Sequence, residues 1–265
     1  MNKEIYDEWI GQAAIREKDE VDALRKVLDP KDKRGVKNSY IDQYLKYYLL
    51  EYLSPSKTDT ILEIGSGIGR LTEYLARFAR SVYGIDIINK FIDDCRKNPA
   101  KKDNTFYLYI DEIDKLQDLM IDKIYIVWVL MCLTDREELI KTLKTYRDNL
   151  PNLKSGIIIE QVKSSFQLEH HNGRLHCCYR TIDEYIDIFT AAGFKVKKYY
   201  IMGERHYGIV YKMIHITRDF LPRKLAMFTD KLFYIDKYIM GDNTGKTRLI
   251  NERRPTDVAF QLEFS

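Results

Sequence analysis

The chain has 265 residues, of which 45% are hydrophobic, and this length suffices for one complete α/β core with an appendage. The 43 basic residues nearly balance the 40 acidic ones, and a net charge of +3 does not indicate a nucleic-acid partner. The four cysteines form no CxxC pair, the first residues lack the apolar core of a signal peptide, and no stretch is apolar enough to span a membrane. These features predict a cytoplasmic protein without a transmembrane segment.

Two helical segments are expected first, over residues 1 to about 35 and over Tyr40–Leu53, before Ser54-Pro55-Ser56 breaks the chain. From Thr60 short apolar strands alternate with helices, which predicts a parallel sheet with crossover helices. The expected strands are Thr60–Ile64, Ser81–Ile85, Thr105–Ile110, Ile121–Leu130 and Gly156–Glu160, and the expected helices are Arg70–Phe78, Asn89–Lys97 and Glu137–Asn149.

The segment after the fifth strand, Gln161–Arg180, has no clear periodicity and is expected to be a functional loop at the carboxyl edge of the sheet. A helix over Thr181–Ala192 follows. Phe194–Ile201 and Tyr207–Ile216 are then predicted as two strands that a short link makes antiparallel. The expected fold is therefore an α/β protein with a seven-stranded, mostly parallel sheet that ends in an antiparallel hairpin.

Three regions are expected along the chain: a helical N-terminal extension over 1–57, the core over 58–216, and a helical C-terminal extension over 217–265. Within the last region, residues 218–240 predict an amphipathic helix with interspersed basic residues. Packing on the core or on a second copy in a homodimer is the favoured interpretation, and a peripheral membrane contact is the alternative.

A glycine-rich loop, Gly65-x-Gly67-x-Gly69, lies between the first strand and its helix, where glycine lets the backbone approach a ligand closely. Asp86 ends the second strand and can accept hydrogen bonds from ribose hydroxyls. The NAD-binding pattern GxGxxG would require glycine at position 70, where this chain has Arg70. Glu63 can face the ammonium and sulfonium end of S-adenosylmethionine (SAM), which NAD lacks, so the loop favours SAM.

Residues 58–216 resemble the class I, Rossmann-like SAM-dependent methyltransferases through Leu62–Gly69, Tyr83–Asp86 and Asp122–Val127. The resemblance implies SAM as cofactor and S-adenosylhomocysteine as product. The cofactor contacts that it implies are Glu63, Gly65, Ser66, Gly67, Gly69, Asp86, Ile87, Asp111, Glu112 and Val127.

A partial resemblance to protein α-N-terminal methyltransferases rests on Gly67–Thr72, Val127–Asp135 and Gly156–Glu160. The chain departs from that family at Cys132, where the family has histidine, and at Gln161–Lys163, where it has an Asp-Asn pair. We therefore expect methyl transfer to an oxygen or nitrogen atom of a small-molecule or glycan acceptor. A protein N-terminal amine methyltransferase and a non-catalytic SAM-binding partner subunit are the alternatives.

A hydroxyl acceptor would need a general base, for which histidine is suited near neutral pH. The candidate bases are Glu160, His170, His171 and His176. The candidate acceptor contacts are Tyr40, Tyr44, Trp128 and Arg180. The spacing of the three histidines, Cys177 and Cys178 fits no standard zinc pattern, so no metal is expected.

Overall fold

The computed structural model describes residues 1–203, 208–241 and 249–264. Its centre is a seven-stranded sheet with the strand order β3-β2-β1-β4-β5-β9-β8. The strands are β1 (Thr60–Ile64), β2 (Ser81–Asp86), β3 (Thr105–Tyr109), β4 (Lys123–Val127), β5 (Ser155–Val162), β8 (Lys195–Met202) and β9 (Thr256–Glu263). The first five in chain order are parallel, and β9 lies antiparallel between β5 and β8.

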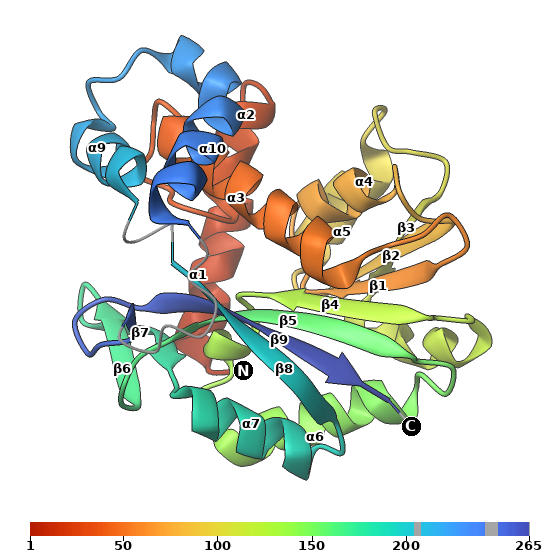
Figure 1. Cartoon of the computed structure of the whole chain (residues 1–265). Helices are drawn as coiled ribbons and strands as arrows, with labels where there is room; N and C mark the ends of the chain where they lie inside the picture. Colours follow the sequence, from red (N-terminus) through yellow and green to blue (C-terminus); the bar gives the residue numbers. More distant parts are fainter. Residues whose placement is uncertain (204–207, 242–248, 265) are drawn as a thin grey trace.

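Helices cover both faces of this sheet (Figure 1). The α-helices are α1 (Lys3–Ala13), α2 (Glu20–Ala23), α3 (Val36–Leu53), α4 (Arg70–Leu75), α5 (Asn89–Lys97), α6 (Arg136–Asp148), α7 (Ile182–Ala191), α9 (Ile209–Thr217) and α10 (Thr229–Met240). Short 3-10 turns are η1 (Leu24–Lys26), η2 (Ile110–Asp118), η3 (Leu130–Cys132) and η4 (Arg223–Phe228). One core packs α6 and α7 against the sheet, and the other packs α3, α4, α9 and α10 against the opposite face. Among the described residues, no helix combines the length and apolar character that crossing a membrane requires.

The mostly parallel seven-stranded sheet with an antiparallel pair at one edge confirms the predicted fold class. The predicted partner in that pair is wrong. Ile209–Thr217 is the helix α9, while Tyr207 lies outside the described residues, and β8 pairs with β9 instead. A short apolar run fits either a strand or a helix, and here Tyr211 and Ile214, three residues apart, form the buried face of a helix.

The expected loop over Gln161–Arg180 is also wrong, because most of it is a two-stranded hairpin of β6 (Gln167–His171) and β7 (Arg174–Tyr179). The turn is Asn172-Gly173, and both residues have positive φ, at 53° and 77°. Asn-Gly is the preferred sequence for such a tight turn, so a local signal for the hairpin was present.

The C-terminal segment expected to be helical supplies β9 to the middle of the sheet's antiparallel half. Val258, Phe260 and Leu262 are fully buried on one face of β9 and belong to one core, while Ala259 is fully buried on the other face and belongs to the second core. Because β9 runs opposite to β5, its first residues lie at the carboxyl edge of the parallel strands, with Asp257 opposite Gln161. This placement brings a C-terminal carboxylate to the edge where ligands of such sheets bind.

Candidate active site

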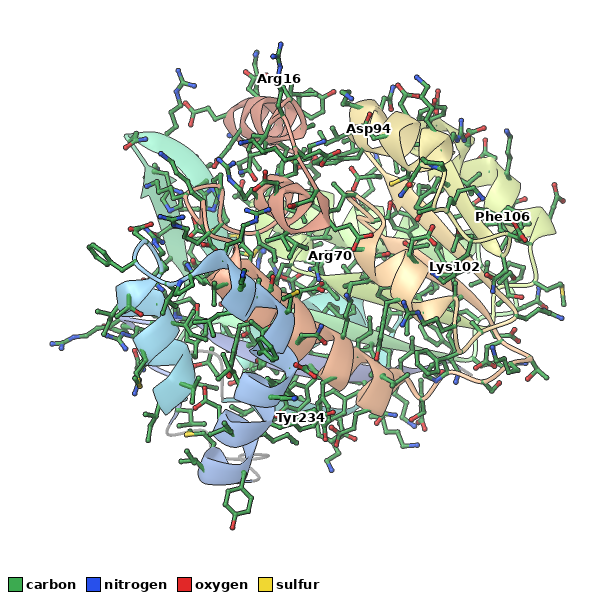
Figure 2. The ribbon with its side chains drawn as sticks, turned by 90° about the horizontal axis from the view of Figure 1, so that it is seen from above. Arg16, Arg70, Asp94, Lys102, Phe106 and Tyr234 are labelled. Atoms are coloured by element: carbon green, nitrogen blue, oxygen red, sulfur yellow. The ribbon has the colours of Figure 1, made fainter. Side chains whose placement is uncertain are left out.

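The glycine loop connects β1 to α4 through left-handed backbone. Gly65 has φ 79° and Gly67 has φ 51°. A Cβ atom on Gly65 would lie 2.2 Å from Val129 Cγ2, and one on Gly67 would lie 2.8 Å from Val27 Cγ1. Both glycines are therefore required by backbone conformation and by close packing. After the loop, Arg70, which is labelled in Figure 2, begins α4 and donates a 2.6 Å hydrogen bond to Asp42 of α3.

Asp86 ends β2 beside the loop and is buried. Its Oδ2 accepts the Gly67 N–H at 2.7 Å, and its Oδ1 accepts the Ile88 N–H at 2.8 Å. Burial nevertheless raises the pKa of Asp86. The carboxylate thus fixes the loop and keeps lone pairs for hydroxyl donors of a ligand. Ile87, the next residue, is exposed and apolar, as an adenine contact would be.

Glu63 is buried near the end of β1. Its Oε2 accepts hydrogen bonds from the Thr72 hydroxyl and, at 2.7 Å, from the Tyr125 hydroxyl. Burial raises the pKa of Glu63 to about 7, although these hydroxyl donors and the charge of Arg70 oppose the shift. A cation next to Glu63 would restore its charged form.

The loop fits a ligand with polar groups, because the buried Ser66 hydroxyl has no hydrogen-bond partner among the described residues. The N-terminal segment covers this region. Val27 contacts Gly67, and Ala13 of α1 clusters with Ile88 and Phe91 just beyond Asp86. Residues preceding the sheet therefore help to enclose the candidate cofactor site.

Asp111 and Glu112 lie in η2, directly after β3. Asp111 is exposed. Glu112 accepts the Tyr109 N–H at 2.9 Å and pairs with Arg96 and Lys115, which lowers its pKa to about 2, with the Lys115 hydrogen bond as the largest cause. Of these two acids, the geometry therefore leaves Asp111 as the better placed for a ligand.

Trp128 follows β4 and the partly buried Val127, and it has a positive φ of 57°. Strained backbone of this kind is frequent at functional sites. The indole Nε1 donates to Asp257 Oδ1 at 3.1 Å, and the Tyr44 hydroxyl donates to Asp257 Oδ2 at 3.0 Å. The structure thus joins two of the predicted acceptor contacts through a buried carboxylate that the sequence analysis does not single out.

Two other predicted acceptor contacts take part in the protein's own hydrogen bonds. Tyr40 is fully buried and donates to Asp236 Oδ2 at 2.8 Å. Arg180 is buried and donates to the carbonyl oxygens of Leu130, Leu133 and Thr134, at 2.6 to 3.3 Å. Both side chains hold structural elements at the edge of the site.

Glu160, a candidate base, is fully buried in β5. Its Oε1 accepts the N–H groups of Val129 and Leu130 at 2.9 and 2.7 Å, and its Oε2 accepts that of Met131 at 3.3 Å. Burial raises its pKa to about 7 against the effect of these three donors. In this arrangement Glu160 shapes the turn that presents Trp128.

The three candidate histidines lie on the β6–β7 hairpin. His170 and His171 are exposed, while His176 is half-buried with its Nδ1 2.8 Å from Glu8 Oε2 of α1. His171 and His176 stack with ring centroids 3.9 Å apart. The hairpin therefore contacts α1 through a histidine pair.

Three residues near the site are not predicted from the sequence, and they come from the two ends of the chain: Asp257, Val27 and Glu8. The alternation Val258-Ala259-Phe260-Gln261-Leu262 gave a signal for β9 and so for Asp257. No local pattern indicates the contacts of Val27 or Glu8, because they depend on how α1 and η1 dock.

A family model described as AdoMet dependent proline di-methyltransferase matches residues 31–204. Among curated proteins, a 23S rRNA (uracil(1939)-C(5))-methyltransferase of Tolumonas auensis is 37% identical over 79 residues, covering 30% of this chain and 18% of that protein. Phosphoethanolamine N-methyltransferase 1 of Caenorhabditis elegans is 35% identical over 78 residues, covering 29% and 16%. Each match spans less than a fifth of the relative's own length.

A solved SAM-dependent methyltransferase from Leishmania major superposes with a TM-score of 0.50 and 15% identity, covering 77% of this chain and 81% of that chain. The [4+2]-cyclase SpnF superposes with a TM-score of 0.53 and 14% identity, covering 83% and 80%. At this level of identity the superpositions establish a shared fold.

Proposed function

The chain belongs to the AdoMet-dependent proline di-methyltransferase family and is a class I SAM-dependent methyltransferase, and from this premise we propose that it methylates an amine nitrogen. The amino-acid sequence alone is compatible with both oxygen and nitrogen acceptors. The family's description names proline, and the phosphoethanolamine relatives are N-methyltransferases, so both favour nitrogen.

The observation that carries this proposal is the buried carboxylate of Asp257 between Trp128 and Tyr44. A carboxylate beside aromatic rings suits a protonated amine, through charge and through cation–π attraction. Trp128 directly precedes Val129, whose side chain packs on Gly65, so this group adjoins the glycine loop. An amine held there would lie beside the cofactor.

Bound SAM supplies an electrophilic methyl group on a sulfonium, and its transfer depends chiefly on alignment. We assign Glu63, Gly65, Ser66, Gly67 and Gly69 to the methionine side of the cofactor. We assign Asp86 and Ile87 to the ribose and adenine, with Asp111 and Val127 at the periphery.

For the acceptor, the negative charge of Asp257, whose two oxygens accept from Trp128 and Tyr44, would favour the approach of the amine as a cation. The amine would release the proton that blocks its lone pair to solvent water, because the pKa of an α-amino group, about 8, lies close to neutral pH. In this scheme no histidine is needed as a base, and residues 1–57 serve as the cover of the site.

The test measures methyl transfer from labelled SAM to peptides that begin with proline or alanine, to phosphoethanolamine and to a glycan hydroxyl acceptor. N-acetylated copies of the peptides are the matched control. Methylation of a free amine, lost on acetylation for the peptides, is the expected result, and transfer to the hydroxyl acceptor alone contradicts the proposal.

The variant that tests the site is Asp257→Asn, which removes the charge with little change in shape. We expect kcat/KM to fall by about 100-fold, equivalent to about 2.7 kcal/mol. Binding of S-adenosylhomocysteine, measured by calorimetry, should be unchanged and serves as the folding control. Wild-type turnover in this variant would remove Asp257 from the site.

A further inference from the structure

Three side chains of metal-binding type meet where α1 crosses the β6–β7 hairpin. Glu8 of α1 and the pair His171 and His176 each offer one ligand atom, and these atoms all lie within 4.8 Å of one another. The closest pair is His176 Nδ1 and Glu8 Oε2, at 2.8 Å. Glu8 and His176 are half-buried and His171 is exposed, so solvent ions can reach the group.

The hairpin brings the two imidazoles together. His171 of β6 pairs with Arg174 of β7 across the turn. His176 lies two residues after Arg174 on β7, so the side chains of His171 and His176 lie on the same face of the hairpin. An irregular register between Glu169 and His170 adjusts the spacing, and the two rings stack with centroids 3.9 Å apart and planes 20° apart. His170, as the neighbour of His171 in a strand, belongs to the opposite face.

We propose that Glu8, His171 and His176 bind one divalent transition-metal ion, with Zn²⁺ as the preferred ion. Two imidazoles and one carboxylate form a common protein ligand set for zinc, which completes its tetrahedron with water. Ion–ligand distances of about 2.1 Å place tetrahedral ligands about 3.4 Å apart, whereas the three ligand atoms here lie within 4.8 Å of one another. On binding, the two stacked imidazoles would rotate out of their parallel arrangement so that the lone pairs in the ring planes point at the ion.

Metal ligands usually have outer polar partners, and polar groups lie near two of the three proposed ligands. Glu169 Oε1 lies 3.9 Å from His171 Nε2, where a carboxylate would orient that ring. Gln12 Nε2 donates to Glu8 Oε1 at 3.4 Å, which leaves Oε2 directed at His176. The contact between helix and hairpin is also held by the Leu175 N–H, which donates to Glu4 Oε2 at 2.8 Å.

The ion would clamp α1 to the hairpin. Because α1 also packs through Ala13 against Ile88 and Phe91, it links the hairpin to the segment that follows Asp86. Asp86 in turn accepts a hydrogen bond from Gly67 of the glycine loop. Metal binding would therefore stabilise the cover of the cofactor site. This inference does not depend on which acceptor is methylated.

The experiment titrates tag-free, chelator-stripped full-length protein with ZnCl₂ by isothermal titration calorimetry and with Co²⁺ by visible absorption. We expect one ion per chain and a tetrahedral cobalt spectrum. His171→Ala, His176→Ala and Glu8→Gln should each weaken binding at least about tenfold. His170→Ala is the matched control, since it removes an adjacent exposed imidazole outside the cluster, and it should bind as the wild type does.

Hydrogen exchange provides a second measurement. Zinc should slow amide exchange in α1 of the wild-type protein and leave it unchanged in the Glu8→Gln variant, whose fold is checked by circular dichroism. The proposal is overturned if the wild type binds no zinc, or if the His171 and His176 variants bind it with wild-type affinity. Neither readout requires methyl transfer, so a failed acceptor assignment would leave this test intact.

Discussion

Two buried glutamates, Glu63 on β1 and Glu160 on β5, have different surroundings. Glu63 accepts hydrogen bonds from hydroxyl groups, which can reorient, whereas Glu160 accepts three fixed backbone N–H groups. Burial raises the pKa of each to about 7. The adaptable surroundings of Glu63 suit a group whose charge changes when a cationic ligand arrives.

This difference predicts a pH dependence of SAM binding. If Glu63 faces the cationic end of SAM, the carboxyl must lose its proton for tight binding, and with a pKa of about 7 it is mostly protonated at pH 6. We expect the affinity for SAM to be about tenfold higher at pH 8 than at pH 6, since one proton is released. Calorimetry at both pH values tests this, and Glu63→Gln should flatten the profile. An equally steep profile in that variant would exclude Glu63 as the source.

At the same scale, some site residues follow from local sequence and others do not. The glycines of the loop and Asp86 occupy positions fixed by a strand, a turn and a helix that are adjacent in the chain. Asp257 reaches Trp128 and Tyr44 only because β9 inserts beside β5. Glu8 meets His176 across 168 positions of sequence, a pairing that no spacing rule can predict.

The strand β9 comes from the C-terminal region, which the sequence predicts as a helical extension outside the core. In the structure, β9 lies within the central sheet, between β5 and β8. Phe260 is fully buried and packs on Phe189 and Tyr185 of α7. We expect Phe260→Ala to lower the free energy of unfolding by about 3–5 kcal/mol, measured by denaturant titration. Gln261→Ala, on the same strand but only half-buried, is the control and should cost about 1 kcal/mol or less. Equal stability of the two variants would mean that β9 is dispensable.

The sequence predicts well those elements in which the hydrophobic periodicity agrees with the turn and capping residues at the ends. The strand and helix of the glycine loop, and the helix ended by Gly193, are of this type. The errors fall on α9 and on the hairpin. In α9 a nine-residue apolar segment fits both periods, and in the hairpin the alternation is weak because β6 is mostly exposed on both faces.

For the whole molecule, the two buried carboxyls predict that the ligand-free protein loses stability as pH rises. Their folded pKa values are raised from 4.5 to about 7, so the folded state holds protons that the unfolded state releases at lower pH. The stabilisation is full below about pH 4.5 and is lost as pH rises through 7. Between pH 6 and pH 8 the loss should be about 1 kcal/mol for each carboxyl, which lowers the Tm by several degrees.

Differential scanning calorimetry at pH 6 and pH 8 measures this shift. Glu160→Gln should lower the Tm at both pH values, since its amide group would face a backbone N–H, and it should also roughly halve the difference between them. A Tm that stays constant or rises over this interval would show that the two carboxyls are ionised in the folded protein at both pH values.

The strand order β5-β9-β8 also has a consequence for how the protein is made. β8 has no neighbour in the sheet until β9 has entered between it and β5, and residues 203–255 must be synthesised in the interval. During that time the edge of β5 and both edges of β8 are unpaired, which is the condition that favours association between nascent chains. The speed of translation through residues 203–255 should therefore affect the yield of folded protein more than the speed of translation before β5 does. Chaperones that shield strand edges should also raise this yield.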